Sequence, residues 1–272
     1  MKIKIIVTAL LSLFFILALS SAMRNSGTCD EIAHHIPSGY VILSKGDLKM
    51  DTCNPPLLRY IVASPLKFFL NINMPDDKKE WRRNDRGSFG RDFFYKYNHE
   101  AKKMLLFARI PIILIGVLCG LLLFIWTANL YGEKAGLFAL LLYVFSPDIL
   151  AHSTLATADM AAAFFIFLSG YSFWLFLKKT SLKRILLAGL CLGLAQLSKF
   201  SAILLYPIFL LPVILGIGSE QKEFKARIFF KYLSVILVSL MTIWAGYGFD
   251  TKPILKDAMR AEEKIEIARK IT

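Results

Sequence analysis

Long apolar stretches, separated by short polar connections and one long polar segment, form the main pattern of this chain. A helix of about 20 apolar residues crosses a hydrocarbon layer of about 30 Å, and a soluble domain has no need of repeated runs of that length. The pattern therefore predicts an all-α integral membrane protein, a polytopic bundle of about seven transmembrane helices, within a range of about six to eight. The stretches run approximately over Ile3–Met23, Met104–Leu130, Ala135–Phe145, Ala156–Leu177, Ile185–Leu197, Ala202–Ile217 and Ile228–Tyr247.

The orientation of these helices follows from their short basic connections. Three basic groups fall on one side if the helices alternate, and the positive-inside rule makes that side cytoplasmic. The segment 24–103 is also basic, but at about 80 residues it exceeds the length of about 60 within which charge controls topology. We therefore expect it on the extracytoplasmic side. The basic groups are Lys2 with Lys4; Lys178, Lys179, Lys183 and Arg184; and Lys222, Lys225, Arg227 and Lys231.

The chain accordingly divides into four predicted parts. These are a first transmembrane helix (1–23), an extracytoplasmic segment (24–103), a transmembrane bundle (104–247) and a charged amphipathic tail (248–272), which we expect outside. The first helix has an alternative interpretation as a secretory signal cleaved after Ala22; the next segment lies outside in either case.

Two stretches within the extracytoplasmic segment have distinct patterns. Leu57–Leu70 carries Arg59 and Lys67 among apolar residues, which predicts an amphipathic helix in the plane of the membrane interface. Asn71–Asn98 is rich in charged residues, Asn and Gly, and is predicted to be a solvated connection or a flexible loop on the acceptor side.

Composition and charge support the membrane class. Hydrophobic residues make up 56% of the 272 residues, against about 45–50% in soluble domains. The net charge of +13 does not indicate nucleic-acid binding, because the cations lie mainly between apolar runs, where they orient helices and meet anionic lipid headgroups. Cys29 and Cys53 share the extracytoplasmic segment and would be free to form a disulfide in an oxidising compartment.

The acids Asp30 and Glu31, just after the first helix, are the first candidates for chemistry. A carboxylate there could act as a general base that takes the proton of an acceptor hydroxyl. Acids at a helix start also cap free amides and favour the helix dipole, and residue types alone favour this alternative. His34 and His35 follow at four-residue spacing, which would place each acid and its histidine on one helix face. Without a third ligand, we predict no metal.

Candidates for substrate binding lie at the extracytoplasmic ends of later helices. Asp148, His152 and Asp159 form one group, of which Asp159 is the best candidate because an apolar run follows it directly; it could equally be a helix cap. Lys199, between two apolar runs, could bind a phosphate or extend to the interface. Arg109, Arg59 and Lys67 have the same two interpretations.

Taken in order, several motifs resemble the GT-C membrane glycosyltransferases of family 39, the protein O-mannosyltransferases and aminoarabinose transferases. The resemblance extends over residues 25–207. Its motifs are Asp30-Glu31 with His35, Gly39 and Tyr40; Gly46-Asp47; Asn54-Pro55-Pro56-Leu57; Ala108-Arg109-Ile110-Pro111; Gly132–Gly136; Ser146-Pro147 through Asp159; and Gly189 to Lys199-Phe200-Ser201.

The resemblance implies an inverting sugar transfer from a polyprenyl-phosphate donor to a hydroxyl or phosphate acceptor on a protein or lipid. The transfer would occur at the outer face of a cell membrane, such as a bacterial inner membrane. The resemblance assigns the catalytic base to Asp30, with Glu31 as companion, and a second acid to Asp159. It suggests Arg109 and Lys199 near the carrier phosphate. We count His35 and Arg59 with these substrate-binding candidates. No cofactor is expected, because the lipid-linked sugar is itself a substrate.

The chain departs from the family pattern at two places. Asn54 stands where relatives often have His. Family members also continue through more helices, so we expect this chain to correspond to an N-terminal portion. Two alternatives stay open: a transporter or lipid-handling protein, for which paired repeats would be expected, and an inactive transferase-like scaffold.

Overall fold

The computed structural model describes residues 2–74, 85–215 and 222–249, with the side chains of the last helix described from Ile228 onward. This part of the chain consists of helices and contains no β-strand. The predicted tail, 248–272, lies almost wholly outside the described residues. The elements are α1 (Lys2–Arg24), η1 (Asp30–His35), α2 (Ile36–Lys45), α3 (Leu57–Phe69), α5 (Arg86–Arg91), η2 (Asp92–Lys96), α6 (Ala101–Tyr131), α7 (Glu133–Val144), α8 (Pro147–Ser153), α9 (Ala158–Lys178), α10 (Leu182–Ser198), η3 (Phe200–Leu204), α11 (Leu205–Leu215) and α12 (Lys222–Gly246).

A helical membrane protein is confirmed, but the predicted number of about seven spans is not. Within the described ranges, four helices are long and apolar enough to cross a membrane: α1, α6, α9 and the part of α12 from Ile228 to Gly246. The helices α7 and α8 pass this test only as a pair bent by 65°, which would make a fifth span. The remaining apolar stretches form helices that are too short, because Ser198-Lys199 separates α10 from η3 and α11.

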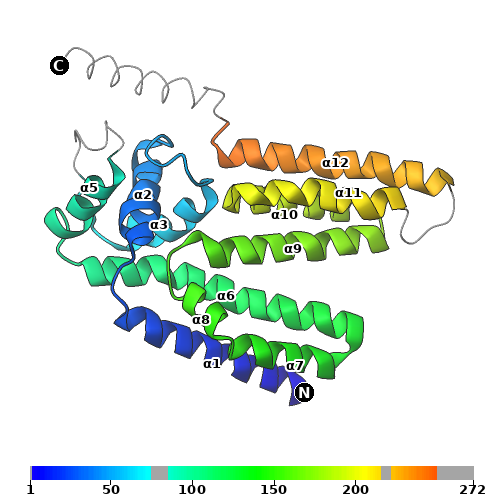
Figure 1. Ribbon diagram of the computed structural model, residues 1–272, viewed down its shortest axis with the longest axis horizontal. Coiled ribbons are helices and arrows are strands. Elements are labelled where there is room, and N and C mark those ends of the chain that lie inside the picture. The colour runs from blue at the N-terminus through cyan, green and yellow to red at the C-terminus, as the bar shows by residue number, and fades with distance from the viewer. Residues whose placement is uncertain (1, 75–84, 216–221, 250–272) are drawn as a thin grey trace, which may run out of the picture.

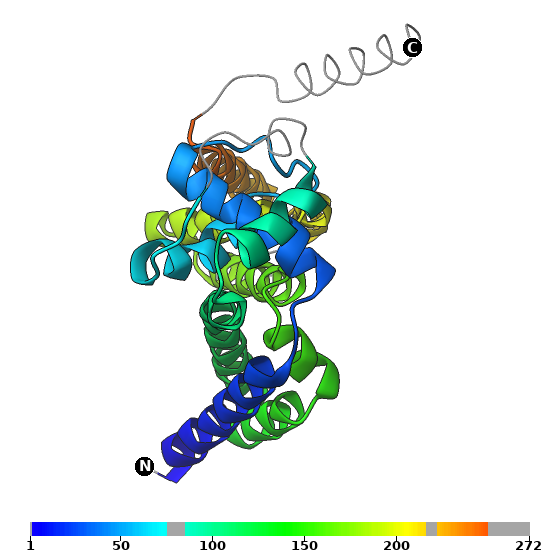
Figure 2. The ribbon, with the colours of Figure 1, turned by 90° about the vertical axis from the view of Figure 1, so that its left-hand side faces the viewer.

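The helices gather into a bundle with a cap at one end. In Figure 1, α1, α6, α7, α9, α10, α11 and α12 run roughly along one direction, while α2, α3 and α5 lie together at the end opposite the N-terminus. We call η1, α2, α3, α5 and η2 the cap. Figure 2, viewed from the cap end, shows these helices in front of the bundle, and α3 contacts both α6 and α10.

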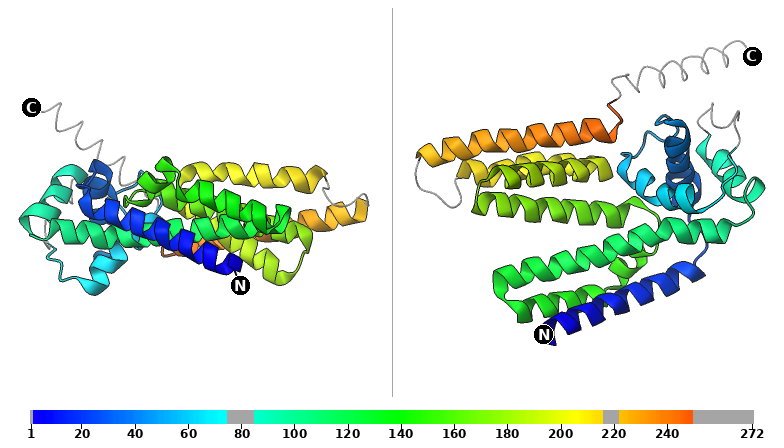
Figure 3. Two further views of the ribbon diagram at one scale, coloured as in Figure 1. Left: turned by 90° about the horizontal axis from the view of Figure 1, so that it is seen from below. Right: turned by 180° about the vertical axis from the view of Figure 1, so that it is seen from behind.

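The basic connections lie at the end of the bundle away from the cap. The start of α1, the connection between α9 and α10, and the start of α12 all lie there, as both Figure 1 and the reverse view in Figure 3 show. The helices therefore alternate in direction in the way that the orientation argument assumed. An extracytoplasmic position of the cap end stays a prediction of the positive-inside rule.

The cap has a packed core of its own. Leu57–Leu70 is a helix as predicted, α3, and its buried face packs against α2. Close approach depends on Gly39, since a Cβ at this position would collide with the Arg59 carbonyl oxygen. The interpretation of the following residues as a solvated connection is wrong for 85–98, because Phe89, Phe93 and Phe94 are buried there. These three aromatic side chains supply enough apolar surface for a packed core, although most of the surrounding residues are polar or charged.

The helices α10 and α12 approach each other through small residues. A Cβ on Gly193 would lie 2.5 Å from the Thr242 Cβ and 2.9 Å from the Ser239 carbonyl oxygen. A Cβ on Gly189, one turn earlier, would lie 2.5 Å from the Val238 Cβ. Small residues four apart allow two backbones to pack closely in a membrane, where the lipid gives no hydrophobic drive toward helix association. The pair thus forms the most closely packed side of the bundle.

Replacing Gly193 with Ala should therefore destabilise the protein. The added methyl has no free space against Thr242, and overpacking of this kind costs about 1–3 kcal/mol. We expect a lower midpoint of thermal unfolding in detergent. Gly170→Ala, in α9, is the matched control, because its nearest neighbour would be a Trp126 ring atom at an ordinary 3.4 Å. Equal midpoints for the two variants would contradict the close packing of α10 on α12.

Candidate active site

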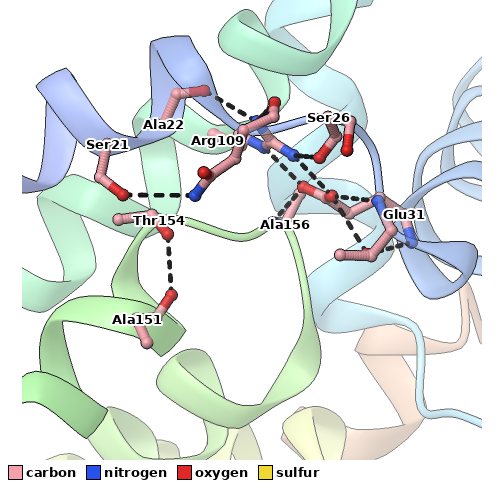
Figure 4. Close-up of polar contacts among 10 residues, drawn as sticks. Ser21, Ala22, Ser26, Glu31, Arg109, Ala151, Thr154 and Ala156 are labelled. Atoms are coloured by element: carbon pink, nitrogen blue, oxygen red, sulfur yellow. Dashed lines mark hydrogen bonds and ion pairs between the residues drawn. The ribbon is translucent and has the colours of Figure 1, made fainter.

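A buried ion pair joins the cap to the bundle. Glu31, in η1, is fully buried, and Arg109, in α6, is 1% exposed. The Arg109 Nε donates to Oε1 of Glu31 at 2.7 Å, and Nη2 donates to Oε2 at 2.8 Å. Two parallel hydrogen bonds between planar groups fix their orientation as well as their distance. Figure 4 shows this pair between the end of α1 and the segment that precedes α9.

The other N–H groups of Arg109 are also occupied. Nη1 donates to the carbonyl oxygens of Ala22 and Asn25, and Nη2 donates to that of Ser26, each at 2.8 Å. A guanidinium has five N–H donors, so all of them have protein partners here. The predicted contact between Arg109 and a carrier phosphate would require one of these bonds to break. Instead, the arrangement satisfies carbonyl groups at the end of α1 that have no helical partner.

The Glu31 carboxylate accepts further hydrogen bonds from both sides. The backbone N–H of Thr28 donates to Oε2 at 2.9 Å, and the backbone N–H of Ala156 donates to Oε1 at 2.9 Å. In return, the Glu31 N–H donates to the Thr28 hydroxyl at 3.3 Å. This reciprocal pattern, Thr-x-x-Glu, is a capping box. The geometry favours the capping alternative for Glu31 over a role as a base.

The protonation of Glu31 follows from these contacts. Burial by itself would raise the pKa of the carboxyl. Hydrogen bonds from Arg109, Thr28 and Ala156, together with the positive charge of Arg109, more than offset this effect and lower the pKa below its ordinary value. Glu31 is thus a buried anion at neutral pH, held by the positive charge and N–H groups around it.

Asp30 has the opposite environment from its neighbour. Its side chain is exposed, and no hydrogen bond or ion pair to its carboxylate is found among the residues described. Its backbone is continuous with Glu31, so the buried ion pair also holds Asp30 in place. Asp30 lies close enough to His35 to raise the pKa of that imidazole, against the larger lowering caused by burial. The Asp30 carboxylate is thus accessible to a ligand and is not used by the fold.

Asp51 is the centre of a second polar group in the cap. It is fully buried, and its Oδ1 accepts from the Arg86 guanidinium at 3.1 Å and from the Cys53 N–H at 3.0 Å. The Nδ1 of His34 lies 3.8 Å from Oδ2. Four-residue spacing does not predict these contacts, because Asp51, His34 and Arg86 are far apart in sequence. Asp51 and Arg86 were not among the candidates.

Arg59, a predicted substrate-binding residue, is buried beside this group rather than extended to the interface. It is 1% exposed, and one Nη donates to the Asn54 carbonyl oxygen at 3.1 Å. Its Nε and its other Nη are buried without a partner. Burial lowers the pKa of the guanidinium, while the charge of Asp51 opposes the shift. Two buried guanidinium nitrogens without an acceptor destabilise the fold, and a bound anionic group could supply the missing hydrogen bonds.

The structure brings together Asp159 and Lys199 at the cap end of the bundle. The Lys199 Nζ lies 3.2 Å from Oδ1 of Asp159, and the His152 Nδ1 lies 3.5 Å from Oδ2. Asp159 and Lys199 are both about half exposed, which leaves them open to a ligand. The expected proximity of His152 and Asp159 is confirmed. Thr157, not Asp159, precedes the first residue of α9, so the alternative of Asp159 as the N-cap is wrong.

Ala156 connects this second group to the first. Its N–H is bound by Glu31, and Asp159 follows three residues later along the chain. Figure 4 shows the contact between Glu31 and Ala156. Through it, one carboxylate fixes the backbone next to Asp30 in the cap and shortly before Asp159 in the bundle. The described Cys29 and Cys53 are free thiols, and no three His, Cys, Asp or Glu side chains among the described residues converge on a point that would hold a metal ion.

Removing the charge of Arg109 should strongly destabilise the fold. In Arg109→Gln, a fully buried carboxylate loses its cation, and carbonyl oxygens at the end of α1 lose their donors. Loss of one partner from a buried pair costs about 3–5 kcal/mol. We expect a large fall in the unfolding midpoint in detergent. Arg91→Gln, an exposed cation of the cap, is the control; comparable losses for both would refute the special role of Arg109.

The depressed pKa of Glu31 predicts an acid-dependent stability. Because the folded-state pKa lies below the ordinary value of about 4.3, the pair stabilises the fold fully above that pH and loses this contribution as the pH falls through the folded-state pKa. Unfolding midpoints measured from pH 7 down to about pH 3 should therefore fall more steeply for the wild type than for Glu31→Gln. Parallel curves would show that another group controls the acid limb.

Comparison with known proteins identifies the family. A search of curated proteins finds no match to this chain. A family model described as dolichyl-phosphate-mannose-protein mannosyltransferase matches residues 102–246, which are just over half of the chain. The matched region extends from α6 through α12 and contains Arg109, Ala156, Asp159 and Lys199. The chain therefore belongs to the dolichyl-phosphate-mannose-protein mannosyltransferase family of GT-C membrane glycosyltransferases.

Proposed function

We propose that this membrane glycosyltransferase transfers a sugar from a polyprenyl-phosphate donor to an acceptor hydroxyl at the extracytoplasmic face, with inversion, and that Asp30 is the base. One observation carries the assignment. Of the two adjacent acids, Glu31 is saturated by protein donors, whereas Asp30 is exposed and unpaired among the described residues. A base needs a free lone pair within reach of the proton that it removes. Asp30 has the free lone pairs that this role needs, whereas those of Glu31 are occupied by protein donors.

The reaction would proceed as a single displacement. The Asp30 carboxylate takes the proton of the acceptor hydroxyl while the hydroxyl oxygen attacks the anomeric carbon of the sugar. The bond from that carbon to the phosphate oxygen breaks, and the polyprenyl phosphate departs with the bonding electron pair. Attack opposite the leaving group inverts the anomeric centre. An acceptor phosphate would need no base, so a requirement for Asp30 favours a hydroxyl on a protein or a lipid.

Lys199 is better placed than Arg109 to bind the donor phosphate. An ammonium has three N–H donors, and the contact with Asp159 uses one of them. Lys199 is exposed at the cap end, whereas every N–H of Arg109 has a protein acceptor. Charge that develops on the departing phosphate would be stabilised by a cation already held in position. Asp159 would act indirectly, by positioning the Lys199 ammonium.

Arg59 supplies a second candidate contact for an anion. Its buried Nε and Nη without partners lie beside the Asp51 group, in the same cap as Asp30. A phosphate oxygen or an acceptor carboxylate would satisfy them at the cost of a small rearrangement. His35 is 4% exposed and also has a buried nitrogen without a partner. Burial lowers the pKa of its imidazole; the charge of Asp30 raises this pKa, and the charge of Arg59 lowers it. The proposed role of His35 is to shape the site rather than to donate a proton.

Replacing Asp30 with Asn should abolish transfer without unfolding the protein. The test uses membranes that contain the full chain, a polyprenyl-phosphate mannose labelled in the sugar, and the label recovered in the protein and lipid fractions. Asp30→Asn should reduce transfer by at least about a hundredfold, the lower limit of the general-base contribution. Its unfolding midpoint should stay unchanged, because the carboxylate makes no described contact.

The control for this test is Asp92→Asn, which makes the same substitution at a surface ion pair with Lys96 in the cap. It should retain transfer. If Asp30→Asn transferred sugar as well as the wild type, the assignment of Asp30 as the base would be overturned. Absence of transfer in the wild type with this donor would instead count against the donor and favour an inactive scaffold.

A further inference from the structure

A crevice runs between α1 and α6, on the side of the bundle away from the α10 and α12 contact. Only four of the 23 residues of α1 are buried: Val7, Phe14, Ala18 and Ala22. The other residues of α1 are exposed or partly buried, and some of them, such as Leu10 and Leu11, pack against the core. Two cavities occupy that space toward the end opposite the cap, and neither contains a residue of the proposed active site.

The first cavity lies at the end of the bundle where the chain begins. It has a volume of about 640 Å³ and combines charged residues at its mouth with an apolar wall. A volume of this size is within the range of about 300–1,000 Å³ typical of small-molecule sites. Its lining consists of Lys2, Ile3, Lys4, Val7 and Thr8 from α1; Leu121, Phe124 and Ile125 from α6; and Glu133 from α7.

The second cavity continues the first along the two helices. It has a volume of about 480 Å³ and shares Thr8 with the first cavity. Leu11, Ser12, Phe15 and Ile16 line it from α1, and Leu114 and Val117 line it from α6. Ser12 and Thr8 are the polar side chains in an otherwise apolar groove that runs toward the middle of the bundle. Its shape and chemistry suit a hydrocarbon chain.

We propose that this crevice is a binding site for one anionic phospholipid of the leaflet opposite the cap. Lys2 and Lys4 bind the headgroup phosphate, and one acyl chain lies in the groove between α1 and α6. The charges fit this occupant: both cations are exposed, and Glu133 is the one acid in the cavity lining, so the mouth has a net positive charge. Glu133 itself begins α7, where the helix dipole favours an acid.

The position in the membrane distinguishes this ligand from the donor lipid. The first cavity is lined by residues at the starts of α1 and α7. Figure 1 shows both starts at the end of the bundle away from the cap, which the positive-inside rule assigns to the cytoplasm. Anionic lipids of that leaflet attract basic residues with about 1 kcal/mol per Lys. Asp30 and Lys199 lie at the opposite end. A lipid here would fill the gap beside a loosely packed helix and stabilise the position of α1, whose last turn supplies a carbonyl to Arg109.

Native mass spectrometry of the purified full chain would test the site. The protein in detergent is mixed with equal amounts of phosphatidylglycerol and phosphatidylcholine of the same acyl length. We expect preferential retention of one phosphatidylglycerol. In the double variant Lys2→Gln/Lys4→Gln, its dissociation constant should rise roughly 25-fold, a factor of about five for each lysine. The variant Lys2→Arg/Lys4→Arg should retain binding.

Two further variants separate the site from general charge effects. Lys179→Gln/Lys183→Gln removes two exposed cations at the same end of the bundle, outside the cavity, and should leave retention unchanged. Ser12→Phe keeps every charge but fills the groove, and should weaken phosphatidylglycerol binding. Equal retention of the two lipids would overturn the proposal. So would an equal loss of phosphatidylglycerol binding in Lys2→Gln/Lys4→Gln and Lys179→Gln/Lys183→Gln. Unchanged binding in Ser12→Phe would overturn the acyl-chain groove. Since the readout is binding, it is independent of whether sugar transfer occurs.

Discussion

The buried ion pair between Glu31 and Arg109 is the contact on which the arrangement of the cap and bundle depends. A charged pair in a membrane protein is costly to desolvate and is tolerated only when further hydrogen bonds satisfy both partners. Here the two groups bond to each other. Arg109 also donates to the Ala22 carbonyl oxygen at the end of α1, and Glu31 accepts from the Ala156 N–H in the segment before α9. Removing any one of these partners leaves the others unsatisfied, so the elements are fixed together rather than separately.

This arrangement separates two tasks between adjacent residues. Glu31 is inward, ionised and fully used by the fold, while Asp30 is outward and unused by it. A carboxylate that stabilises the structure cannot also exchange protons during turnover without weakening that structure. The position next to Glu31 gives Asp30, the proposed base, a fixed backbone and leaves its side chain free. The same division recurs in the bundle, where Ala156 is held by Glu31 and Asp159 remains half exposed.

The sequence could predict what depends on local pattern. Apolar runs gave the helices, basic connections gave their alternation, and the amphipathic pattern gave α3. The number of spans could not be obtained in this way, because hydropathy does not register the bend between α7 and α8 or the break after Ser198. The ordered residues 85–98 were also missed, because charged residues outnumber the three phenylalanines that form their core.

The candidate site shows the same limit. Its acids were found from their position next to α1, and the Thr28-x-x-Glu31 signal that identifies one of them as a cap was present in the sequence but not used. Asp51 and Arg86 had no such signal, since their significance comes from a contact between residues 35 positions apart. Burial of Arg59 likewise depends on how α3 packs against α2 and α6, which an amphipathic pattern alone cannot specify.

The residues of the site also belong to two different parts of the chain. The family match includes Arg109, Ala156 and Lys199 but begins after the cap, which carries Asp30. The bundle therefore provides the positive charge and the N–H group that hold Glu31, and through Glu31 it sets the position of the exposed acid. A cap detached from the bundle would keep Asp30 but lose the contacts that orient it. A bundle without the cap would keep Lys199 but lack Asp30, the proposed base. The proposed site therefore depends on the junction between cap and bundle, where Glu31 binds both Arg109 and Ala156.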